Sequence, residues 1–264
     1  MTDKMLFMAG PCVIESMDCL ETVAERMLDV SNRLNLDYYF KASWDKANRT
    51  AADKYRGPGL EKGLQMLSDI KEKYGVKIIT DFHETWQARE VAKVADMIQV
   101  PAFLSRQTDM IKAAAETGLP VQIKKAQFMT PDDMYNVAGK MLYYGNDQIY
   151  LCDRGTCFGY HNLVVDMTGL AKMKTFGHKV VFDATHSVQL PGTGTNNSTM
   201  GNSMYVKELA MAACAIGIDG LFMEVHPNPD EALCDAACML RLDDVEGLLK
   251  KCIRIREIAL GDIC

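Results

Sequence analysis

The chain has 264 residues, of which 48% are hydrophobic and 24% are charged, a composition that supports a globular core and argues against disorder. Its formal net charge of -6 argues against a general nucleic-acid binder or membrane-surface binder, but leaves small anionic substrates open. The longest strongly apolar stretch, at 209–218, is about ten residues and too short to cross a bilayer, and residues 1–7 show no secretory signal, so we expect a cytoplasmic protein.

Short runs rich in Val, Ile, Phe and Tyr recur at fairly even intervals along the chain and predict β-strands. In chain order these runs span 6–11, 38–43, 77–82, 97–102, 121–126, 149–153, 179–184 and 221–225. Segments between them have apolar residues at helical spacing, among them 19–34, 59–74, 85–94 and 108–117, and residues 243–259 predict a closing helix.

The alternation of strands and helices favours a parallel sheet with helical crossovers. Eight such units in about 260 residues match the length of a (β/α)8 TIM barrel, an α/β fold. A doubly wound open sheet is the alternative, although one domain of that kind usually needs fewer strands. Because no linker, low-complexity tract or composition break divides the sequence, we expect a single barrel domain spanning residues 1–264.

Basic residues follow several predicted strands, at the end where a barrel gathers its catalytic residues. The basic residues expected to share this rim are Lys41, Lys46, Arg49, Lys124, Lys125 and Arg154. Any one of them could be a solvated loop residue, but a shared rim on an acidic protein weakens that interpretation. Because neighbouring cations repel one another, the cluster predicts ligands with more than one phosphate or carboxylate group.

A second set of chemistry-bearing residues follows the first, seventh and eighth predicted strands. It consists of Cys12, His186, Glu224 and Asp235. A thiolate, an imidazole and two carboxylates suit Zn²⁺, Fe²⁺ or a similar divalent ion. No local motif joins these residues, however; Cys12 could be a packed thiol, and His83 and His226 compete as ligands. The nine cysteines of the chain form no CxxC pair, so we expect reduced thiols of which few do chemistry.

Longer characteristic segments surround these residues. They are AGPCVIES (9–16), FKASWDKANRT (40–50), YRGPGLEKG (55–63), IITDFHE (78–84), IQVPAFLSRQTD (98–109), KKAQF (124–128), CDRGTCFGYHNLVVDM (152–167), FDATHSVQLPG (182–192) and MEVHPNP (223–229). Together they resemble the 3-deoxy-D-manno-octulosonate 8-phosphate synthase family over about residues 7–256. The KANRT segment separates this family from the related synthase of the shikimate pathway, which carries a Lys-Pro-Arg-Thr type motif there.

The resemblance implies a reaction and a set of substrate contacts. Phosphoenolpyruvate would condense with D-arabinose 5-phosphate and water to give 3-deoxy-D-manno-octulosonate 8-phosphate and phosphate, a step toward lipopolysaccharide. Carbon C3 of phosphoenolpyruvate attacks the sugar aldehyde, water adds at C2, and phosphate leaves through C–O cleavage. The implied phosphoenolpyruvate contacts are Lys124 and Arg154 at the phosphate, with Lys41, Ser43, Lys46 and Gln99 around the carboxylate and reacting carbons. The implied sugar contacts are Asn48, Arg49 and Thr50 at the phosphate, Asp81 at the hydroxyls, and Arg106 from a neighbouring subunit of a homotetramer.

The metal site is also implied by resemblance, because metal-dependent members of this family carry Cys in the first loop where other members carry Asn. It implies that a divalent ion such as Zn²⁺, Fe²⁺ or Mn²⁺ binds Cys12, His186, Glu224 and Asp235, and that His83 and His226 are not ligands. The candidate catalytic residues are then Lys46, Asp81, His186 and Cys12. The ion would either position and polarise the aldehyde or activate the water, and the sequence does not choose between these roles.

The loop 192–206, GTGTNNSTMGNSMYV, departs from the family pattern of a glycine pair followed by an arginine. It contains no Arg or Lys, and its Gly, Asn, Ser and Thr residues predict a loop that is mobile without ligand. Two other functions stay open. One is a related synthase that uses erythrose 4-phosphate, which the KANRT segment disfavours; the other is a barrel that binds sugar phosphates as a regulator without turnover.

Overall fold

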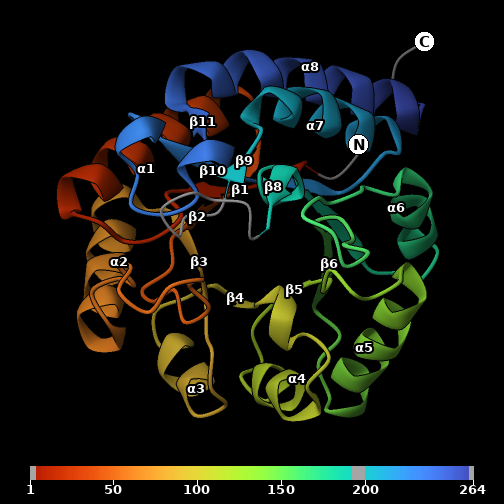
Figure 1. The fold of residues 1–264 in the computed structure, drawn as a ribbon, viewed down its shortest axis with the longest axis horizontal. Coiled ribbons are helices and arrows are strands. Elements are labelled where there is room, and N and C mark those ends of the chain that lie inside the picture. The colour runs from red at the N-terminus through yellow and green to blue at the C-terminus, as the bar shows by residue number, and fades with distance from the viewer. Residues whose placement is uncertain (1–3, 192–199, 262–264) are drawn as a thin grey trace.

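The strands of the protein form a closed parallel barrel (Figure 1). The computed structural model describes residues 4–191 and 200–261. The barrel strands are β1 (Leu6–Gly10), β2 (Asp37–Lys41), β3 (Lys77–Asp81), β4 (Met97–Val100), β5 (Val121–Lys124), β6 (Ile149–Asp153), β7 (Lys179–Asp183) and β10 (Gly220–His226). Neighbours in this order pair in parallel, and β10 pairs with both β7 and β1, which closes the ring. The predicted (β/α)8 barrel is confirmed, and the open-sheet alternative is wrong.

Helices fill the crossovers and surround the barrel (Figure 1). They are α1 (Met17–Arg33), α2 (Leu60–Tyr74), α3 (Gln87–Val91), α4 (Thr108–Ala115), α5 (Pro131–Tyr143), α6 (Met167–Lys174), α7 (Val206–Ala215) and α8 (Leu242–Leu260). Helix α3 is shorter than the predicted segment 85–94, because the chain after it continues in turns with bonds between residues three apart. Within the described ranges, no helix is long and apolar enough to cross a membrane.

Three short strands follow the last two barrel strands in the chain. Strand β8 (Gln189–Leu190) pairs antiparallel with β9 (Met200–Gly201), and β11 (Leu240–Arg241) pairs in parallel with the end of β10. Residues 192–199, which include most of the loop predicted to be mobile, lie outside the described residues. The last part of that loop forms β9 and a single 3-10 turn, Ser203–Tyr205.

Side chains fill the interior of the barrel, as expected when successive strand residues alternate between its two faces. The buried inward-facing cluster consists of Leu6, Met8, Tyr39, Ile79, Met97, Cys152, Val181 and Phe222. Neighbouring strand residues such as Phe7, Phe40 and Ile78 belong instead to the larger core that packs against the helices. Polar residues at the carboxyl ends of the strands therefore lie above a closed apolar layer.

The first loop owes its path to a close approach between β1 and β2. A Cβ atom at Gly10 would lie 2.0 Å from the carbonyl oxygen of Lys41, so only glycine fits there. Pro11 follows and cannot donate to the ladder, which ends β1 before residue 11. Beyond it, Val13 and Ser43 form an isolated parallel bridge, and this holds Cys12 at the mouth of the barrel.

Candidate active site

A hollow of about 350 Å³ lies at the carboxyl ends of the barrel strands. The predicted site residues that line it are Lys41, Lys46, Asn48, Arg49, Thr50, Asp81, Gln99, Lys124, Arg154, His186 and Asp235. Ser43 is buried beside it and accepts a hydrogen bond from Lys41 Nζ at 2.6 Å. The fold thus brings most of the predicted residues to one cavity.

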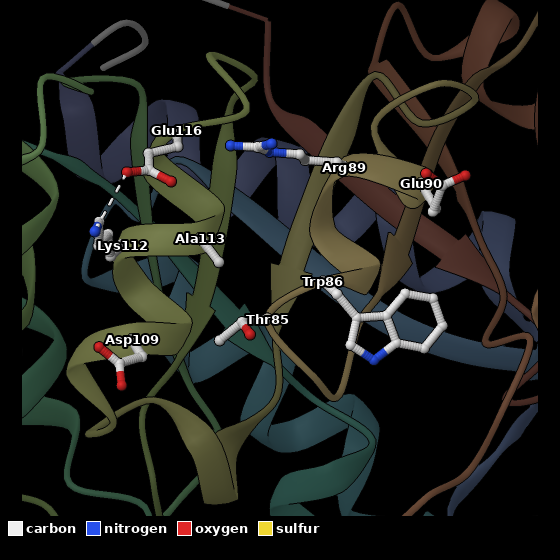
Figure 2. Close-up of a pocket in the computed structure, with 8 residues that line it drawn as sticks. All are labelled: Thr85, Trp86, Arg89, Glu90, Asp109, Lys112, Ala113 and Glu116. Atoms are coloured by element: carbon white, nitrogen blue, oxygen red, sulfur yellow. Dashed lines mark ion pairs between the residues drawn. The ribbon is translucent and has the colours of Figure 1, made fainter.

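A second hollow, of about 440 Å³, lies on the outside of the barrel between α3 and α4 (Figure 2). Its lining residues are Thr85, Trp86, Arg89, Glu90, Asp109, Lys112, Ala113 and Glu116. Lys112 and Glu116 form an ion pair at 3.7 Å along α4, and most of the charged side chains here are exposed. None of the charged side chains that line this outer hollow is buried, so we place the candidate active site at the barrel mouth.

Asp81 and Lys41 form a buried polar pair on one wall of the barrel-mouth hollow. Lys41 Nζ lies 4.0 Å from Asp81 Oδ1, and His83 Nε2 lies 3.4 Å from Asp81 Oδ2. Burial lowers the pKa of Lys41, and the charge on Lys46 lowers it further. Burial alone would raise the pKa of Asp81, but the nearby cations, Lys41 first among them, hold it well below its usual range. Asp81 is therefore an ionised acceptor.

Lys46 lies between this pair and the predicted metal ligands. Its Nζ is 3.7 Å from Glu224 Oε1, and its side chain is buried. Burial alone would lower the pKa of Lys46, but the charge of Cys12 once it is ionised, and that of Glu224, raise it well above its usual value. Lys46 therefore stays cationic and offers positive charge to an anionic ligand.

The four predicted metal ligands belong to two neighbouring groups that share Asp235: Cys12 with Cys234 and Asp235, and His186 with Glu224 and Asp235. Cys12 Sγ is 3.4 Å from Asp235 Oδ2, and His186 Nε2 is 3.5 Å from Glu224 Oε1 and 3.8 Å from Asp235 Oδ2. Burial raises the pKa of the Cys12 thiol. Both carboxylate oxygens of Glu224 are buried without a hydrogen-bond partner in the described part of the chain. Buried acceptors without donors beside an imidazole and a thiol are the chemistry that a divalent cation satisfies.

Asp183, at the end of β7, connects the predicted metal ligands with Lys124. Its Oδ2 atom lies 2.5 Å from Lys124 Nζ and 2.7 Å from His186 Nδ1, while Oδ1 accepts from the His186 backbone N–H at 2.9 Å. Despite complete burial, His186 and Lys124 hold the pKa of Asp183 far below its usual range. By accepting from Nδ1, Asp183 directs Nε2 of His186 toward Glu224 and Asp235.

Arg49 joins the KANRT loop to the loop that carries Asp235. Its Nη1 donates to Cys234 Sγ at 2.6 Å, and its Nη2 donates to the Leu233 carbonyl oxygen at 3.2 Å. Cys234 Sγ in turn lies 3.5 Å from Asp235 Oδ2. Asp235 itself adopts a left-handed backbone conformation at φ 48°. Sequence reasoning missed Cys234 because nothing local marks it.

Lys125 does not line the hollow, contrary to the prediction for the basic rim. Its Nζ donates to Thr156 Oγ1 at 3.0 Å and lies 3.8 Å from Asp153 Oδ2. Asp153 Oδ1 also accepts from the backbone N–H of Gly155 at 2.7 Å. Lys125 therefore stabilises the turn after β6, which begins at Arg154. It is not one of the cations that face the cavity.

The two remaining predicted arginines differ sharply in their surroundings. Arg154 is buried, its Nη2 donates to Gln189 Oε1, and its Nη1 has no hydrogen-bond partner among the described residues. The Arg106 side chain is 66% exposed, lies 4.0 Å from Asp133 Oδ1 and does not line the hollow of its own chain. Its predicted role in a neighbouring subunit stays a prediction.

The whole chain resembles known proteins. Residues 1–260 match the DAHP synthetase I family. The chain is 53% identical over 258 residues to the 2-dehydro-3-deoxyphosphooctonate aldolase of Fusobacterium nucleatum, covering 98% of this chain and 92% of that protein. Proteins of the same name from Desulfotalea psychrophila (50% over 252 residues, 96% and 90% covered) and Helicobacter pylori strain P12 (50% over 270 residues, 97% of each covered) are also similar. The chain therefore belongs to the DAHP synthetase I family.

Proposed function

We propose that the protein condenses phosphoenolpyruvate with D-arabinose 5-phosphate and water to give 3-deoxy-D-manno-octulosonate 8-phosphate and phosphate. The observation that carries this proposal is the cavity at the barrel mouth, where buried and half-buried cations surround unpartnered polar atoms. The names of the similar proteins support the same reaction. The catalytic unit would be the single barrel formed by residues 1–264.

Lys124 and Arg154 would hold the phosphate of phosphoenolpyruvate, because both are buried cations that line the cavity. Arg154 Nη1 is a donor with no hydrogen-bond partner within the described ranges, so it is free to donate to a phosphate oxygen. The residues around the carboxylate and the reacting carbons would be Lys41, Ser43, Lys46 and Gln99. Lys46, kept cationic by its anionic neighbours, would stabilise negative charge that develops during condensation.

The sugar phosphate would bind the loop at 46–50, through Asn48, Arg49 and Thr50, which line the same cavity. Asp81 would accept from the sugar hydroxyls, because it is ionised and its Oδ1 has no hydrogen-bond partner in the described structure. Arg106 is exposed at the surface, and in a homotetramer it would reach the sugar phosphate in a neighbouring subunit.

Replacing Arg49 tests the sugar-phosphate assignment. We expect Arg49→Ala to raise KM for arabinose 5-phosphate about ten- to hundredfold, because a charge-assisted contact contributes about 1.5–3 kcal/mol. KM for phosphoenolpyruvate should change little. Arg89→Ala, on the outer hollow, is the matched control and should leave both constants unchanged. Equal losses for the two substrates in Arg49→Ala would show that Arg49 belongs to a different subsite.

A divalent ion such as Zn²⁺, Fe²⁺ or Mn²⁺ would be held by Cys12, His186, Glu224 and Asp235. The fit rests on the close approach of their donor atoms and on the two unpartnered oxygens of Glu224. When bound, such an ion supplies Lewis-acid chemistry, either polarising the aldehyde or activating the water. The protein's own contribution is to orient the ligands, above all by the contact between Asp183 and His186 Nδ1.

Asp183→Asn tests whether this contact orients His186. We expect the variant to bind Zn²⁺ about ten- to hundredfold more weakly, because an amide holds the imidazole in the ligating tautomer less strongly than a carboxylate does. The measurement is a competition titration of metal-stripped protein against a chelator dye. Asp230→Asn, at a well exposed aspartate in the loop after β10, is the matched control. Unchanged affinity in Asp183→Asn would refute the orienting role.

A further inference from the structure

A second cluster of metal-ligand side chains lies outside the barrel-mouth cavity. It consists of Glu15 in the loop after β1, Cys19 in the first turn of α1, and His226 at the end of β10. One potential ligand atom from each residue lies within 4.8 Å of the others. None of the three lines the cavity, and the roles proposed above use none of them.

His226 turns a buried ring nitrogen, Nε2, toward this cluster. The residue is 6% exposed, and its Nδ1 lies 2.7 Å from the carbonyl oxygen of Asn228. Nδ1 also lies 3.1 Å from the backbone nitrogen of Asn228, so Asn228 takes up Nδ1 and Nε2 is the ring nitrogen that can ligate an ion. Nε2 has no hydrogen-bond partner of normal length in the described part of the chain; the nearby Cys19 and Glu15 raise the pKa of His226 to about 10, so a bound cation takes the place of the Nε2 proton. A backbone carbonyl on the far nitrogen is the usual support of a metal-ligating histidine.

The position of Glu15 fits a shared ion better than a direct bond to His226. Glu15 Oε1 accepts from the backbone N–H of Leu233 at 2.8 Å, which fixes the carboxylate. The other oxygen, Oε2, lies 3.5 Å from His226 Nε2, whereas a direct charge-assisted bond is about 2.7–2.9 Å long. Two ligands of one tetrahedral Zn²⁺ lie about 3.3–3.8 Å apart, given metal–ligand distances of about 2.0–2.3 Å. His186 and Glu224 in the candidate metal site have the same separation, 3.5 Å.

Cys19 supplies the third ligand atom, its Sγ, and as a thiolate it adds a second negative charge to that of Glu15. Its backbone N–H donates to the Ser16 side chain at 3.2 Å, so its sulfur lies in the first turn of α1. A cation bound there would hold Cys19 as the thiolate. A thiolate and the Glu15 carboxylate together carry the charge that one divalent cation neutralises.

We propose that Glu15 Oε2, Cys19 Sγ and His226 Nε2 form a second binding site for a borderline divalent cation of the Zn²⁺ type. A thiolate, an imidazole and a carboxylate leave the fourth tetrahedral position to water. The ion joins the start of α1 to the end of β10. Through the Glu15 bond to Leu233 it also anchors the segment that leads to Asp235. None of the three ligands lines the barrel-mouth cavity, so the ion stabilises the folded chain by binding to it and takes no part in the proposed reaction.

The number of bound ions tests this proposal directly. Metal-stripped protein is titrated with Zn²⁺ alone and its metal content is measured by mass spectrometry. We expect about two ions per chain in the unmodified protein and about one in Cys19→Ser. Glu15→Gln, which keeps an acceptor for Leu233, provides a second variant with the same expected loss. Both variants should retain kcat and KM, whereas loss of the barrel-mouth ion would abolish turnover.

Cobalt spectroscopy assigns the sulfur ligand. In Cys12→Asn loaded with Co²⁺, a thiolate-to-cobalt charge-transfer band should remain, should disappear on adding Cys19→Ser, and should survive Cys234→Ser. A single ion in the unmodified protein would overturn the proposal. So would a second ion that persists in Cys19→Ser, or a residual band that depends on Cys234, since that ion would belong to the barrel mouth.

Discussion

Prolonged chelation is expected to lower the rate of condensation roughly a thousandfold, because a Lewis-acidic ion contributes several kcal/mol to transition-state stabilisation. Glu224 has two buried oxygens with no hydrogen-bond donor among the described residues, and His186 Nε2 faces two carboxylates, which is the donor set that a divalent ion fits. Adding Zn²⁺, Fe²⁺ or Mn²⁺ should restore turnover. Full activity in a preparation shown to be metal-free would contradict the assignment of Cys12 as a thiolate ligand.

Cys12→Asn tests whether the effect of chelation depends on Cys12 as a metal ligand. An asparagine amide can donate to Asp235, which Cys12 Sγ already contacts at 3.4 Å, and so can tie the loop together without an ion. We therefore expect a partly active enzyme that no longer responds to chelation, while Cys12→Ala should be far less active. Site residues that act as a unit are not additive, so full activity is not expected. Residual activity that still requires metal would contradict this view of the site. Cys19→Ser is the thiol control, and its activity should respond to chelation as the unmodified protein does.

The second large effect concerns the length of the sugar. Arabinose 5-phosphate should be used at least about a hundredfold better than erythrose 4-phosphate, measured as kcat/KM at saturating phosphoenolpyruvate with metal present. The loop at 46–50 would anchor the sugar phosphate at one end of the cavity, and Lys124 and Arg154 would anchor phosphoenolpyruvate at the other. Because the aldehyde must reach C3 of phosphoenolpyruvate while its own phosphate stays bound, one missing carbon misplaces the reacting atoms.

A higher kcat/KM for erythrose 4-phosphate than for arabinose 5-phosphate would contradict this account. It would identify the enzyme as the related synthase of the shikimate pathway. Comparing both sugars with Arg49→Ala separates the two anchors. If the KANRT loop determines which sugar length fits, Arg49→Ala should lower kcat/KM for arabinose 5-phosphate. The ratio of kcat/KM between arabinose 5-phosphate and erythrose 4-phosphate should then decrease. A preference that is unchanged in Arg49→Ala would show that another part of the cavity measures the sugar.

The barrel could be predicted from sequence because each strand is a short, buried, β-branched or aromatic run followed by an amphipathic segment. The predicted strand 149–153 coincides with β6, and 221–225 differs from β10 by single residues at both ends. The eight predicted barrel strands differ from the structure only at their ends, and the short strands β8, β9 and β11 were not predicted. The run 38–43 was predicted to extend beyond the end of β2 at Lys41, because Ala42 and Ser43 are also buried. Apolar residues in the sequence indicate which positions are buried, but they do not indicate where strand hydrogen bonding ends.

The candidate site residues were predicted from their positions at strand ends and from family resemblance, and residues outside these two signals were missed. Lys124 and Lys125 were both placed on the rim, yet consecutive residues in extended chain point to opposite sides, so only Lys124 faces the cavity. That signal was present in the sequence. The role of Asp183 was also within reach, since it ends a strand three residues before His186. Cys234 was not, because its contacts with Arg49 and Asp235 depend on an irregular loop.

The most direct test of the account is to incubate the metal-loaded protein with phosphoenolpyruvate and arabinose 5-phosphate and to measure released phosphate and product mass together. The proposed reaction predicts one phosphate released for each eight-carbon sugar acid phosphate formed, with neither appearing when the sugar is omitted. Binding of the sugar phosphate without phosphate release would identify a non-catalytic barrel and contradict the proposal.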